Sequence, residues 1–363
     1  MADITKEQIE SALKEFIDPH LEQDLVSTKC VKDITINGAK VSVKVVVGYP
    51  SDTYKAKLAS ALQERVEGVD GVASADVDVS WKIAAHAVQK TLKPIDNVKN
   101  IIAVASGKGG VGKSTTSVNL ALALSAEGAK VGILDADIYG PSQPRMLGVS
   151  GQPESKDGKT LEPMVNYDLQ CMSIGFLVDE ETPMIWRGPM VTQALEQLLG
   201  DTNWDDLDYL IIDLPPGTGD TQLTLAQKVP VSGAVIVTTP QDIALLDARK
   251  GLKMFQKVEV PVLGIVENMS THICTECGHE EHIFGQGGGM SMSEQYDVDF
   301  LGALPLDMQI RVETDEGKPT VVADPDGRIA EIYREIARRT TAKLSLHAKN
   351  YAQKFPSIVI QNN

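Results

Sequence analysis

The residues best suited to chemistry form a glycine-rich stretch at positions 106–115, which reads SGKGGVGKST. It contains G-x-x-x-x-G-K-S, a phosphate-binding pattern whose glycines let backbone N–H groups point at phosphate oxygens. Lys113 would reach the β- and γ-phosphates, and the Ser114 hydroxyl would bind Mg²⁺. A strand-like run at 100–105 precedes the loop and a helical run at 115–125 follows it, so a helix N-terminus adds its partial positive charge. The expected phosphate-binding residues are Gly107, Lys108, Gly109, Gly110, Val111, Gly112, Lys113, Ser114 and Thr115.

Two further apolar runs end in aspartates, whose carboxylates suit Mg²⁺ beside a phosphate. The run 208–213 ends in Asp213 and is followed by Pro-Pro-Gly-Thr-Gly, which is the Walker B arrangement. Asp213 would hold Mg²⁺ through water, and the loop after it could sense the γ-phosphate. The run 130–135 ends in Asp135-Ala-Asp137, whose two carboxylates can face one loop edge. The alternative for this second pair is a turn that only reverses the chain.

The phosphate-binding stretch also carries an early lysine, Lys108, and K-G-G-V-G-K-S resembles the deviant Walker A loop of the MinD/ParA/nitrogenase-iron-protein ATPases. The resemblance implies ATP as the nucleotide and a homodimer in which Lys108 reaches the nucleotide of the facing subunit. It makes Lys108, Lys113 and Asp137 the catalytic residues, with Asp137 orienting or activating the attacking water. The alternative for Lys108 is a solvated loop lysine. The expected Mg²⁺ ligands, direct or through water, are Ser114, Asp135 and Asp213.

Two residues are candidates for contact with the base. Asn268 ends the strand-like run that begins at 262, and it resembles the base-recognition asparagine of the same ATPase class. An amide can pair with the N6 donor and the N7 acceptor of adenine together. Pro305 ends the run 300–305 and would border the adenine, as in relatives. The alternative for Asn268 is a capping or turn asparagine.

A C-x-x-C motif, Cys274 and Cys277, follows shortly after Asn268. Two thiolates in a nucleotide-hydrolase loop suggest a metal, but they supply half of a four-ligand site. A second subunit could bring two more cysteines, or nearby histidines could complete a zinc site. The motif could also be a redox dithiol, or the cysteines could be incidental to a polar loop. The histidines available for zinc are His272, His279 and His282.

The motifs together resemble the Mrp/ApbC/NBP-type iron–sulfur carrier ATPases over residues 98–345. They are K-G-G-V-G-K-S, D-A-D-I-Y-G-P-S, D-L-P-P-G-T-G-D and N-M-S-x-x-x-C-x-x-C-G. In that family the C-x-x-C motifs of two subunits bind one 4Fe–4S cluster at the dimer interface, and Cys274 and Cys277 match those positions. Four thiolates are what such a cluster needs. The additional N-terminal cysteine cluster of the eukaryotic relatives is absent, so a second cluster is not implied.

Residues 1–82 predict a small α+β domain of order α-β-β-α-β. Helical patterns at 4–17 and 51–67 alternate with strand patterns at 31–36, 39–47 and 72–81, and Asn-Gly between the first two strands is a hairpin signal. The order resembles the small domain often fused to or partnered with iron–sulfur assembly proteins. Relatives often carry a reactive cysteine after the second strand, which this chain lacks there. Cys30 is therefore interpreted as a bystander, and the domain as a docking or regulatory module.

A linker at 83–98 is expected to lead into a P-loop ATPase domain at 99–346, with a tail at 347–363. Strand and helix patterns alternate through this second domain, which predicts an α/β fold with a mostly parallel sheet covered by helices. Right-handed crossovers would then place all ligand loops on one edge of the sheet. Trp186-Arg187-Gly188-Pro189 also resembles the family, but its role is not readable from the sequence.

The bulk composition excludes several classes of partner. The chain has 34 basic and 50 acidic residues, a net charge of −16, which argues against a nucleic-acid backbone as partner. No run is apolar and long enough to span a bilayer, and the N-terminus lacks a signal-peptide pattern. We therefore expect a cytoplasmic protein with no membrane partner, whose four cysteines are not disulfide-bonded.

The leading hypothesis is an ATP-dependent carrier that binds a 4Fe–4S cluster at a homodimer interface and hydrolyses ATP slowly. Its partners would be a cluster donor or scaffold and apo iron–sulfur client proteins. One alternative is a ParA/MinD-like positioning ATPase, which would need a basic surface or a membrane helix. A zinc-stabilised regulatory ATPase is a further alternative.

Overall fold

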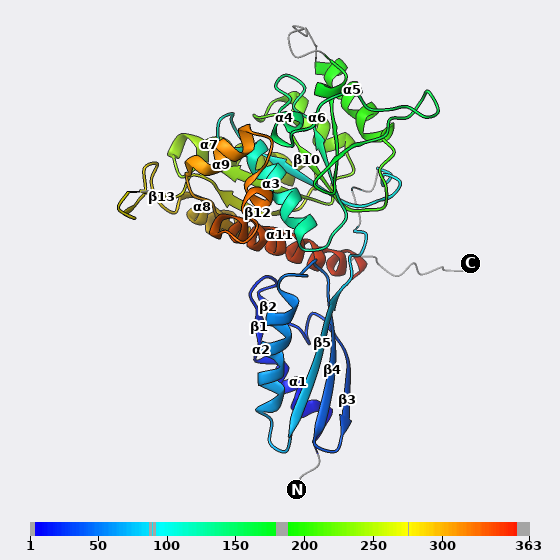
Figure 1. Cartoon of the computed structure of the whole chain (residues 1–363), viewed down its shortest axis with the longest axis vertical. Coiled ribbons are helices and arrows are strands. Elements are labelled where there is room, and N and C mark those ends of the chain that lie inside the picture. Colours follow the sequence, from blue (N-terminus) through cyan, green and yellow to red (C-terminus); the bar gives the residue numbers. More distant parts are fainter. Residues whose placement is uncertain (1–3, 87–88, 90–91, 179–187, 275, 354–363) are drawn as a thin grey trace, which may run out of the picture. The chain divides into compact units, whose positions relative to one another are not determined.

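The computed structural model describes residues 4–86, 89, 92–178, 188–274 and 276–353 (Figure 1). The chain divides into two compact units. The small unit contains residues 1–49, 54–87 and 341–363, and the large unit contains residues 50–53 and 88–340. The two ends of the chain therefore belong to the same unit.

The last helix, α11 (Arg328–Gln353), is longer than the sequence predicted. The apolar pattern after Pro325 predicts a long helix as far as about Leu346, and the sequence analysis placed a tail at 347–363. No proline or glycine occurs between residues 328 and 353, so the chain carries no helix-breaking residue there. Residues from 341 onward belong to the small unit, whereas the sequence assigned them as far as 346 to the ATPase domain.

The small unit has the expected order of helix, strand, strand, helix and strand. β3 and β4 are antiparallel, and β4 and β5 are parallel. The turn between β3 and β4 contains Gly38, whose φ of 62° lies in the left-handed region that glycine adopts without strain. The two-residue strands β1 and β2 were not expected. The elements are α1 (Lys6–Lys14), β1 (Ile17–Asp18), β2 (Gln23–Asp24), β3 (Val31–Asn37), β4 (Lys40–Val47), α2 (Lys55–Glu67) and β5 (Ser74–Trp81).

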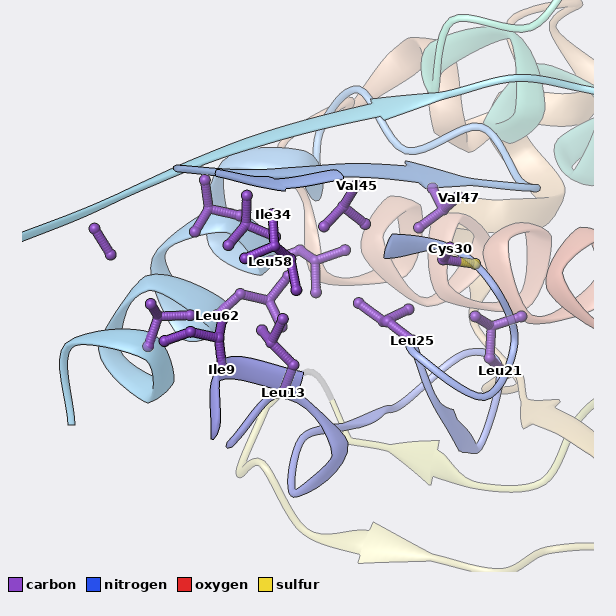
Figure 2. Packing of buried hydrophobic residues seen from close by; sticks show 14 of the residues in the cluster. Ile9, Leu13, Leu21, Leu25, Cys30, Ile34, Val45, Val47, Leu58 and Leu62 are labelled. Carbon is purple, nitrogen blue, oxygen red and sulfur yellow. The ribbon is translucent and has the colours of Figure 1, made fainter. Parts of the chain in front are cut away.

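The small unit buries one hydrophobic cluster between its helices and its three-stranded sheet (Figure 2). Alternate residues of β4 are buried, as a period of two requires when one face of a strand is covered. In α2, Leu58 and Leu62 lie one turn apart and face the same cluster. Ala342 of α11 is buried in it as well. The small unit therefore takes part of its core from the far end of the sequence.

The large unit is built on one eight-stranded sheet, which confirms the predicted mostly parallel α/β fold. The strand order is β15-β12-β11-β6-β10-β7-β9-β8, and only β8 and β9 are antiparallel neighbours. Every residue of β7, β10 and β11 is buried, so both faces of the sheet are covered there. The strands are β6 (Val98–Ala105), β7 (Val131–Asp135), β8 (Met164–Asn166), β9 (Leu169–Ser173), β10 (Leu207–Asp213), β11 (Gly233–Thr238), β12 (Val262–Glu267) and β15 (Phe300–Ala303).

Helices alternate with these strands, as the sequence predicted. The polar region 149–168 contributes β8 to a hairpin with β9. A separate short hairpin follows β12 and is formed by β13 (His272–Ile273) and β14 (Glu280–Glu281). The helices are α3 (Lys113–Ala126), α4 (Gln143–Met146), α5 (Gly188–Gly200), α6 (Asp220–Lys228), α7 (Asp242–Lys257), α8 (Gly288–Tyr296), α9 (Met308–Asp315) and α10 (Thr320–Ala323), with a 3₁₀ turn at Ile174–Phe176.

The sheet register brings the predicted site residues to one edge. Asp213, the last residue of β10, pairs with Val104 of β6 on one side and with Asp135 of β7 on the other. The phosphate-binding loop follows directly after β6. The three strands are parallel, so their carboxyl ends and the loops that follow meet at the same place.

A buried ion pair fixes the other end of α3. Arg338 donates to Glu127, which ends α3, and the two side chains are 3% and 0% exposed. Glu127 also accepts from the backbone N–H of Thr53 at 3.0 Å and from the Thr53 hydroxyl at 2.5 Å. Arg338 makes a second pair with Glu331, at 2.6 Å. The P-loop helix is thereby tied at its C-terminal end to α11.

We expect Arg338→Met to lower the free energy of unfolding of the large unit by about 3 kcal/mol, because it leaves the buried Glu127 carboxylate without its counter-ion. Urea unfolding measures the change. Arg311→Met is the matched control, because Arg311 pairs with Asp315 on the surface, where the side chains are 66% and 52% exposed. That substitution should change stability by less than about 0.5 kcal/mol. Equal effects of the two substitutions would contradict the assignment of Arg338 and Glu127 as a stabilising buried ion pair.

Candidate functional site

Glycines shape the phosphate-binding loop as the sequence predicted. Gly110 and Gly112 each have a φ of 80°, in the left-handed region. A Cβ on Gly112 would lie 2.1 Å from the Asn268 side-chain nitrogen, and a Cβ on Gly107 would lie 2.1 Å from the backbone of Asp247. No other residue fits at either point without displacing its neighbours. α3 begins at Lys113, so its free N–H groups face the loop.

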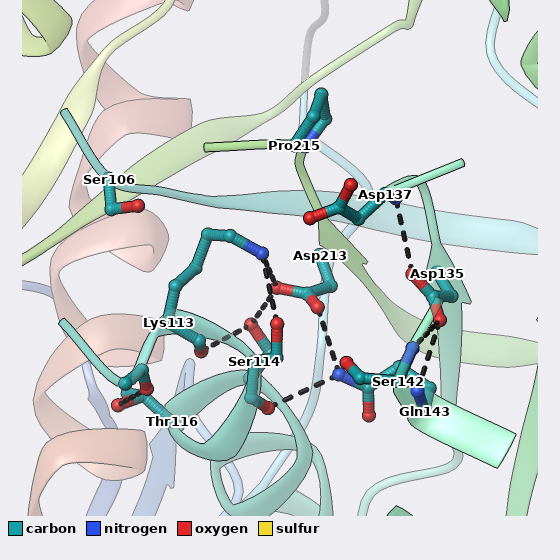
Figure 3. A network of polar contacts seen from close by, with 12 residues as sticks. Ser106, Lys113, Ser114, Thr116, Asp135, Asp137, Ser142, Gln143, Asp213 and Pro215 are labelled. Atoms are coloured by element: carbon teal, nitrogen blue, oxygen red, sulfur yellow. Dashed lines mark hydrogen bonds and ion pairs between the residues drawn. The ribbon is translucent and has the colours of Figure 1, made fainter. Parts of the chain in front are cut away.

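Lys113 and Asp213 form a buried ion pair at the centre of the site (Figure 3). Lys113 Nζ lies 2.6 Å from Asp213 Oδ1, and the side chains are 6% and 0% exposed. The same ammonium lies 3.1 Å from the Ser114 hydroxyl. The Ser117 hydroxyl donates to Asp213 Oδ1 at 2.8 Å. The predicted Walker A lysine, Mg²⁺ serine and Walker B aspartate are therefore within direct reach of one another.

Gln143, which the sequence analysis did not select, completes this cluster. Its side-chain nitrogen donates to Asp213 Oδ2 at 3.0 Å and to the Ser114 carbonyl oxygen at 3.2 Å. It is fully buried and is the first residue of α4. A single glutamine carries no motif, so the only available signal was its place in the loop that follows Asp135.

Asp135 fastens the loop that carries the other predicted catalytic aspartate. Its carboxylate accepts backbone N–H bonds from Asp137 at 3.2 Å, Ser142 at 2.8 Å and Gln143 at 3.0 Å. The Ser173 hydroxyl adds a fourth bond at 3.2 Å. Burial, and then the nearby Asp213 charge, raise the pKa of Asp135 to about 7. In this structure Asp135 thus fixes the loop through these hydrogen bonds. Its role toward a Mg²⁺-bound water stays a prediction.

Asp137 is only half buried and faces the centre of the site. Figure 3 shows its carboxylate on the side of Lys113 and Asp213. Burial raises its pKa, and the neighbouring Lys113 charge opposes that rise. A cavity of about 250 Å³ lies beside it, lined also by Pro215, Pro216 and Gln222. The predicted water-orienting residue and the predicted phosphate-sensing loop therefore share one cavity.

The oxygen-rich set of side chains fits a hard cation such as Mg²⁺. The Ser114 hydroxyl and the Asp213 carboxylate are the ligand types that a P-loop site uses. Gln143 Oε1 is buried and lacks a hydrogen-bond partner among the described residues, so it can accept from a water on such a cation. The ligand assignments of Ser114, Asp135 and Asp213 remain predictions.

Asn268 touches the phosphate-binding loop. Its side-chain nitrogen donates to the Val111 carbonyl oxygen at 2.9 Å, and its side-chain oxygen accepts from the Met269 N–H at 3.0 Å. Both ends of the amide are therefore engaged with backbone in this structure. Pro305 is half buried. It lies near Asn268, because the N–H of the preceding residue, Leu304, donates at 2.8 Å to the carbonyl oxygen of Glu267, the residue before Asn268. Adenine contacts of Asn268 and Pro305 stay predictions.

Cys274 and Cys277 lie at the tip of the β13–β14 hairpin, the first half-buried and the second exposed. The Cys274 N–H donates to the His279 carbonyl oxygen and the Gly278 N–H to the Cys274 carbonyl oxygen, both at 2.9 Å. Backbone N–H groups, first that of Cys277 and then that of Glu276, lower the pKa of the Cys274 thiol. The turn therefore holds both cysteines at the end of the hairpin and favours the thiolate of Cys274, the form that a metal requires.

The histidines beside the hairpin contact backbone oxygens. His272 Nδ1 lies 3.1 Å from the Leu306 carbonyl oxygen, and His282 Nδ1 lies 3.0 Å from that of Ser270. Within the described ranges, which omit residue 275, no three His, Cys, Asp or Glu side chains are grouped so that they could hold a metal ion. In these described ranges, one chain thus supplies two thiols close together in the sequence but no group of three ligands for zinc.

Glu267 holds both ends of the segment that contains the hairpin. Its carboxylate is 1% exposed, and it accepts from the Ser270 hydroxyl at 2.6 Å and from the Gly289 N–H at 2.5 Å. Ser270 precedes the hairpin and Gly289 lies in α8 after it. The thiols therefore stand on a loop whose base is fixed next to Asn268.

Two other predicted features have a simple outcome. Lys108 is partly exposed, and its carbonyl oxygen accepts from the Ser106 hydroxyl at 2.9 Å. Of the Trp186-Arg187-Gly188-Pro189 segment, Gly188 begins α5, whereas Trp186 and Arg187 lie outside the described residues.

None of the helices in the described part is both apolar and long enough to cross a membrane.

The parallel sheet, the glycine-rich loop at a helix N-terminus and the paired lysine and aspartate define a P-loop NTPase. The chain belongs to the NUBPL iron-transfer P-loop NTPases, whose family model matches residues 97–341. A second model, described as iron–sulfur cluster assembly protein, matches residues 6–79. Both resemblances inferred from the sequence motifs are therefore confirmed, that of the ATPase motifs and that of the small domain.

Similar proteins carry names that agree with this family. The chain is 60% identical to an iron–sulfur cluster carrier protein of Pseudomonas fragi, over 76% of this chain and 97% of that protein. It is 50% identical to one of Escherichia coli, over 93% and 91%. It is 52% identical to the mouse iron–sulfur cluster transfer protein NUBPL, over 69% and 80%. A nucleotide-binding protein of Archaeoglobus fulgidus in complex with ADP is 38% identical, with a TM-score of 0.56 over 64% of this chain and 90% of that one.

We expect Gly112→Ala to weaken ATP binding by about tenfold or more, because alanine pays about 1–2 kcal/mol in the left-handed region and its Cβ collides with Asn268. Calorimetric titration with ATP and Mg²⁺ measures the loss. Gly200→Ala is the control, since a Cβ there meets nothing within 4 Å and the residue ends α5. An unchanged affinity in Gly112→Ala would mean that the loop does not bind the nucleotide in this conformation.

Proposed function

We propose that this protein is an ATP-dependent carrier that binds a 4Fe–4S cluster between two copies of the chain and transfers it to apo-proteins. The observation that supports this most is the pair Cys274 and Cys277, half-buried and exposed, at the tip of a hairpin whose segment begins at Asn268 on the phosphate-binding loop. The names of the similar proteins point the same way. The cluster is then the cargo, received from a donor or scaffold and delivered to iron–sulfur clients.

The homodimer follows from ligand number. A 4Fe–4S cluster takes four thiolates, and the hairpin of one chain offers two. The other two cysteines are buried, Cys30 in the small unit and Cys171 in β9. A second copy supplies a second exposed pair by symmetry, which is the simplest way to complete the set.

ATP binding would rearrange the centre of the site. Lys113 has to leave Asp213 in order to reach the β- and γ-phosphates, so the 2.6 Å ion pair is exchanged for phosphate contacts. Bound Mg²⁺ would neutralise phosphate charge while Ser114 and Asp213 hold it. Asp137 is placed to orient the attacking water, and Lys108 would extend to the nucleotide of the facing copy. We propose that hydrolysis is slow.

The thiols would respond to the nucleotide through Asn268. This residue bonds to Val111 in the phosphate-binding loop and begins the segment that carries the hairpin. A change at the loop would therefore shift the base of the hairpin and alter how readily the cluster is received or released. This coupling distinguishes a carrier from a positioning ATPase, which would instead be retained on DNA or on lipid.

We expect Lys113→Ala to abolish ATP binding and with it the maturation of an apo iron–sulfur client, because the other lysine of the loop, Lys108, would extend to the nucleotide of the facing copy and not replace this ammonium. Calorimetric titration with ATP and a client-activation assay measure the two effects. Lys130→Ala is the matched control: its ammonium pairs with Asp206 at the surface, where each side chain is 61% exposed. If Lys113→Ala kept both ATP binding and client maturation, the assignment of this loop as the nucleotide-binding P-loop would be rejected.

Anaerobic purification and metal analysis test the cargo. We expect about four irons and four sulfides per dimer in the parent chain and almost none in Cys277→Ala, which lacks half of the thiolates. Cys30→Ala, which removes a buried thiol of the small unit, should keep the full cluster content. About one zinc per chain without sulfide, even after reconstitution, would favour the zinc-stabilised ATPase and reject the carrier.

A further inference from the structure

Gln143 connects the two halves of the nucleotide site. It is 0% exposed, and its side-chain nitrogen donates both to Asp213 Oδ2 and to the Ser114 carbonyl oxygen. Asp213 ends strand β10, and Ser114 lies in the first turn of α3. One amide group therefore joins the strand that would hold the cation to the helix whose serine would bind it.

The oxygen at the other end of the same amide is evidence for a bound ligand. Gln143 Oε1 is buried, yet it has no hydrogen-bond partner in the described part of the chain. Buried polar atoms are satisfied in the great majority of cases. Its amide nitrogen bonds to the two elements that supply the expected cation ligands (Figure 3), so the amide group lies next to the expected cation site. A water molecule on a divalent cation is a donor of the right kind.

The backbone of Gln143 is held as firmly as its side chain. Its N–H donates to Asp135 Oδ2 at 3.0 Å, next to the Ser142 N–H bond to the same oxygen. Asp135 also accepts from the Asp137 N–H. The loop from 137 to 143 is thus pinned at both ends by one carboxylate, and the amide enters the site from a fixed position.

We propose that Gln143 is a positioning residue for Mg²⁺ at the nucleotide site. Its N–H groups hold Asp213 and the first turn of α3 in place, and its Oε1 accepts a hydrogen bond from a water on the cation. The inference rests on the proposed function of the site as a Mg²⁺–nucleotide site. It gives Asp213 a fixed partner that stays when Lys113 moves to the phosphates.

The Mg²⁺ dependence of ADP binding tests this role without any turnover. The quantity to measure is the ratio of ADP dissociation constants in EDTA and in Mg²⁺, by calorimetric titration of the full-length chain. Gln143→Met keeps the side-chain length but removes both polar atoms, so it should lower the ratio about tenfold, as the loss of an outer-shell partner does. The affinity without Mg²⁺ should stay within about twofold, because no contact to phosphate is removed.

A second variant should move the same ratio in the opposite direction. Gln143→Glu keeps an acceptor oxygen and adds a negative charge beside Asp213, so it should weaken ADP binding in EDTA and increase the gain from Mg²⁺. Gln170→Met is the matched control: Gln170 lies in β9 and donates to the Asp205 carbonyl oxygen at 3.1 Å. It should leave the ratio unchanged.

The outcomes separate this inference from the proposed function. A normal Mg²⁺ effect in the parent chain that Gln143→Met leaves intact would overturn the role of Gln143 alone. The same would follow if the Met and Glu variants lowered the ratio alike, because damage to packing would act in the same direction in both variants. A parent chain whose ADP affinity does not depend on Mg²⁺ would overturn the proposed site and this inference together.

Discussion

The large unit depends on the ion pair between Lys113 and Asp213. Both side chains are removed from water, and a buried charge is tolerated only when its partner and its hydrogen bonds are in place. Ser117 and Gln143 supply those bonds to the carboxylate. In the proposed function, nucleotide binding would therefore amount to an exchange of counter-ions, in which the lysine turns to phosphate and the aspartate turns to a cation. Neither half of this exchange would be favourable without the other.

Two buried side chains connect the phosphate-binding loop to the segment that carries the cysteines. Asn268 contacts the carbonyl of Val111 inside the phosphate-binding loop. Its neighbour Glu267 closes the base of the cysteine-bearing segment by bonding to Ser270 and Gly289. Consecutive residues at the end of one strand thus contact the phosphate-binding loop and the cysteine-bearing segment. This short distance along the chain would let one sheet hold both proposed sites without an added domain between them.

The sequence predicted the fold and most of the site because both rest on local patterns. Apolar strands that end in Asp135 and Asp213 predicted where parallel strands would bring carboxylates together, and the register confirms that meeting. The loop glycines were predictable because their backbone angles exclude other residues.

What the sequence could not give depends on contacts between distant segments. Gln143 has no signature of its own, and its role depends on how the loop after Asp135 folds back to Asp213. Asn268 was predicted as a base-reading amide, and only the folded chain places that amide against Val111. The full length of α11 was also missed, because the sequence predicted a tail from residue 347 whereas the helix continues to Gln353.

The composition of the small unit has a consequence for biosynthesis. Its core joins residues near the start of the chain, such as Ile9, to Ala342 of α11, and Lys343 pairs with Glu22 at 2.7 Å. A ribosome releases these partners with the nucleotide-binding unit between them. The small unit therefore waits, with part of its core uncovered, until that unit has been made. Synthesis of α11, rather than of β5, sets the time at which this small unit closes.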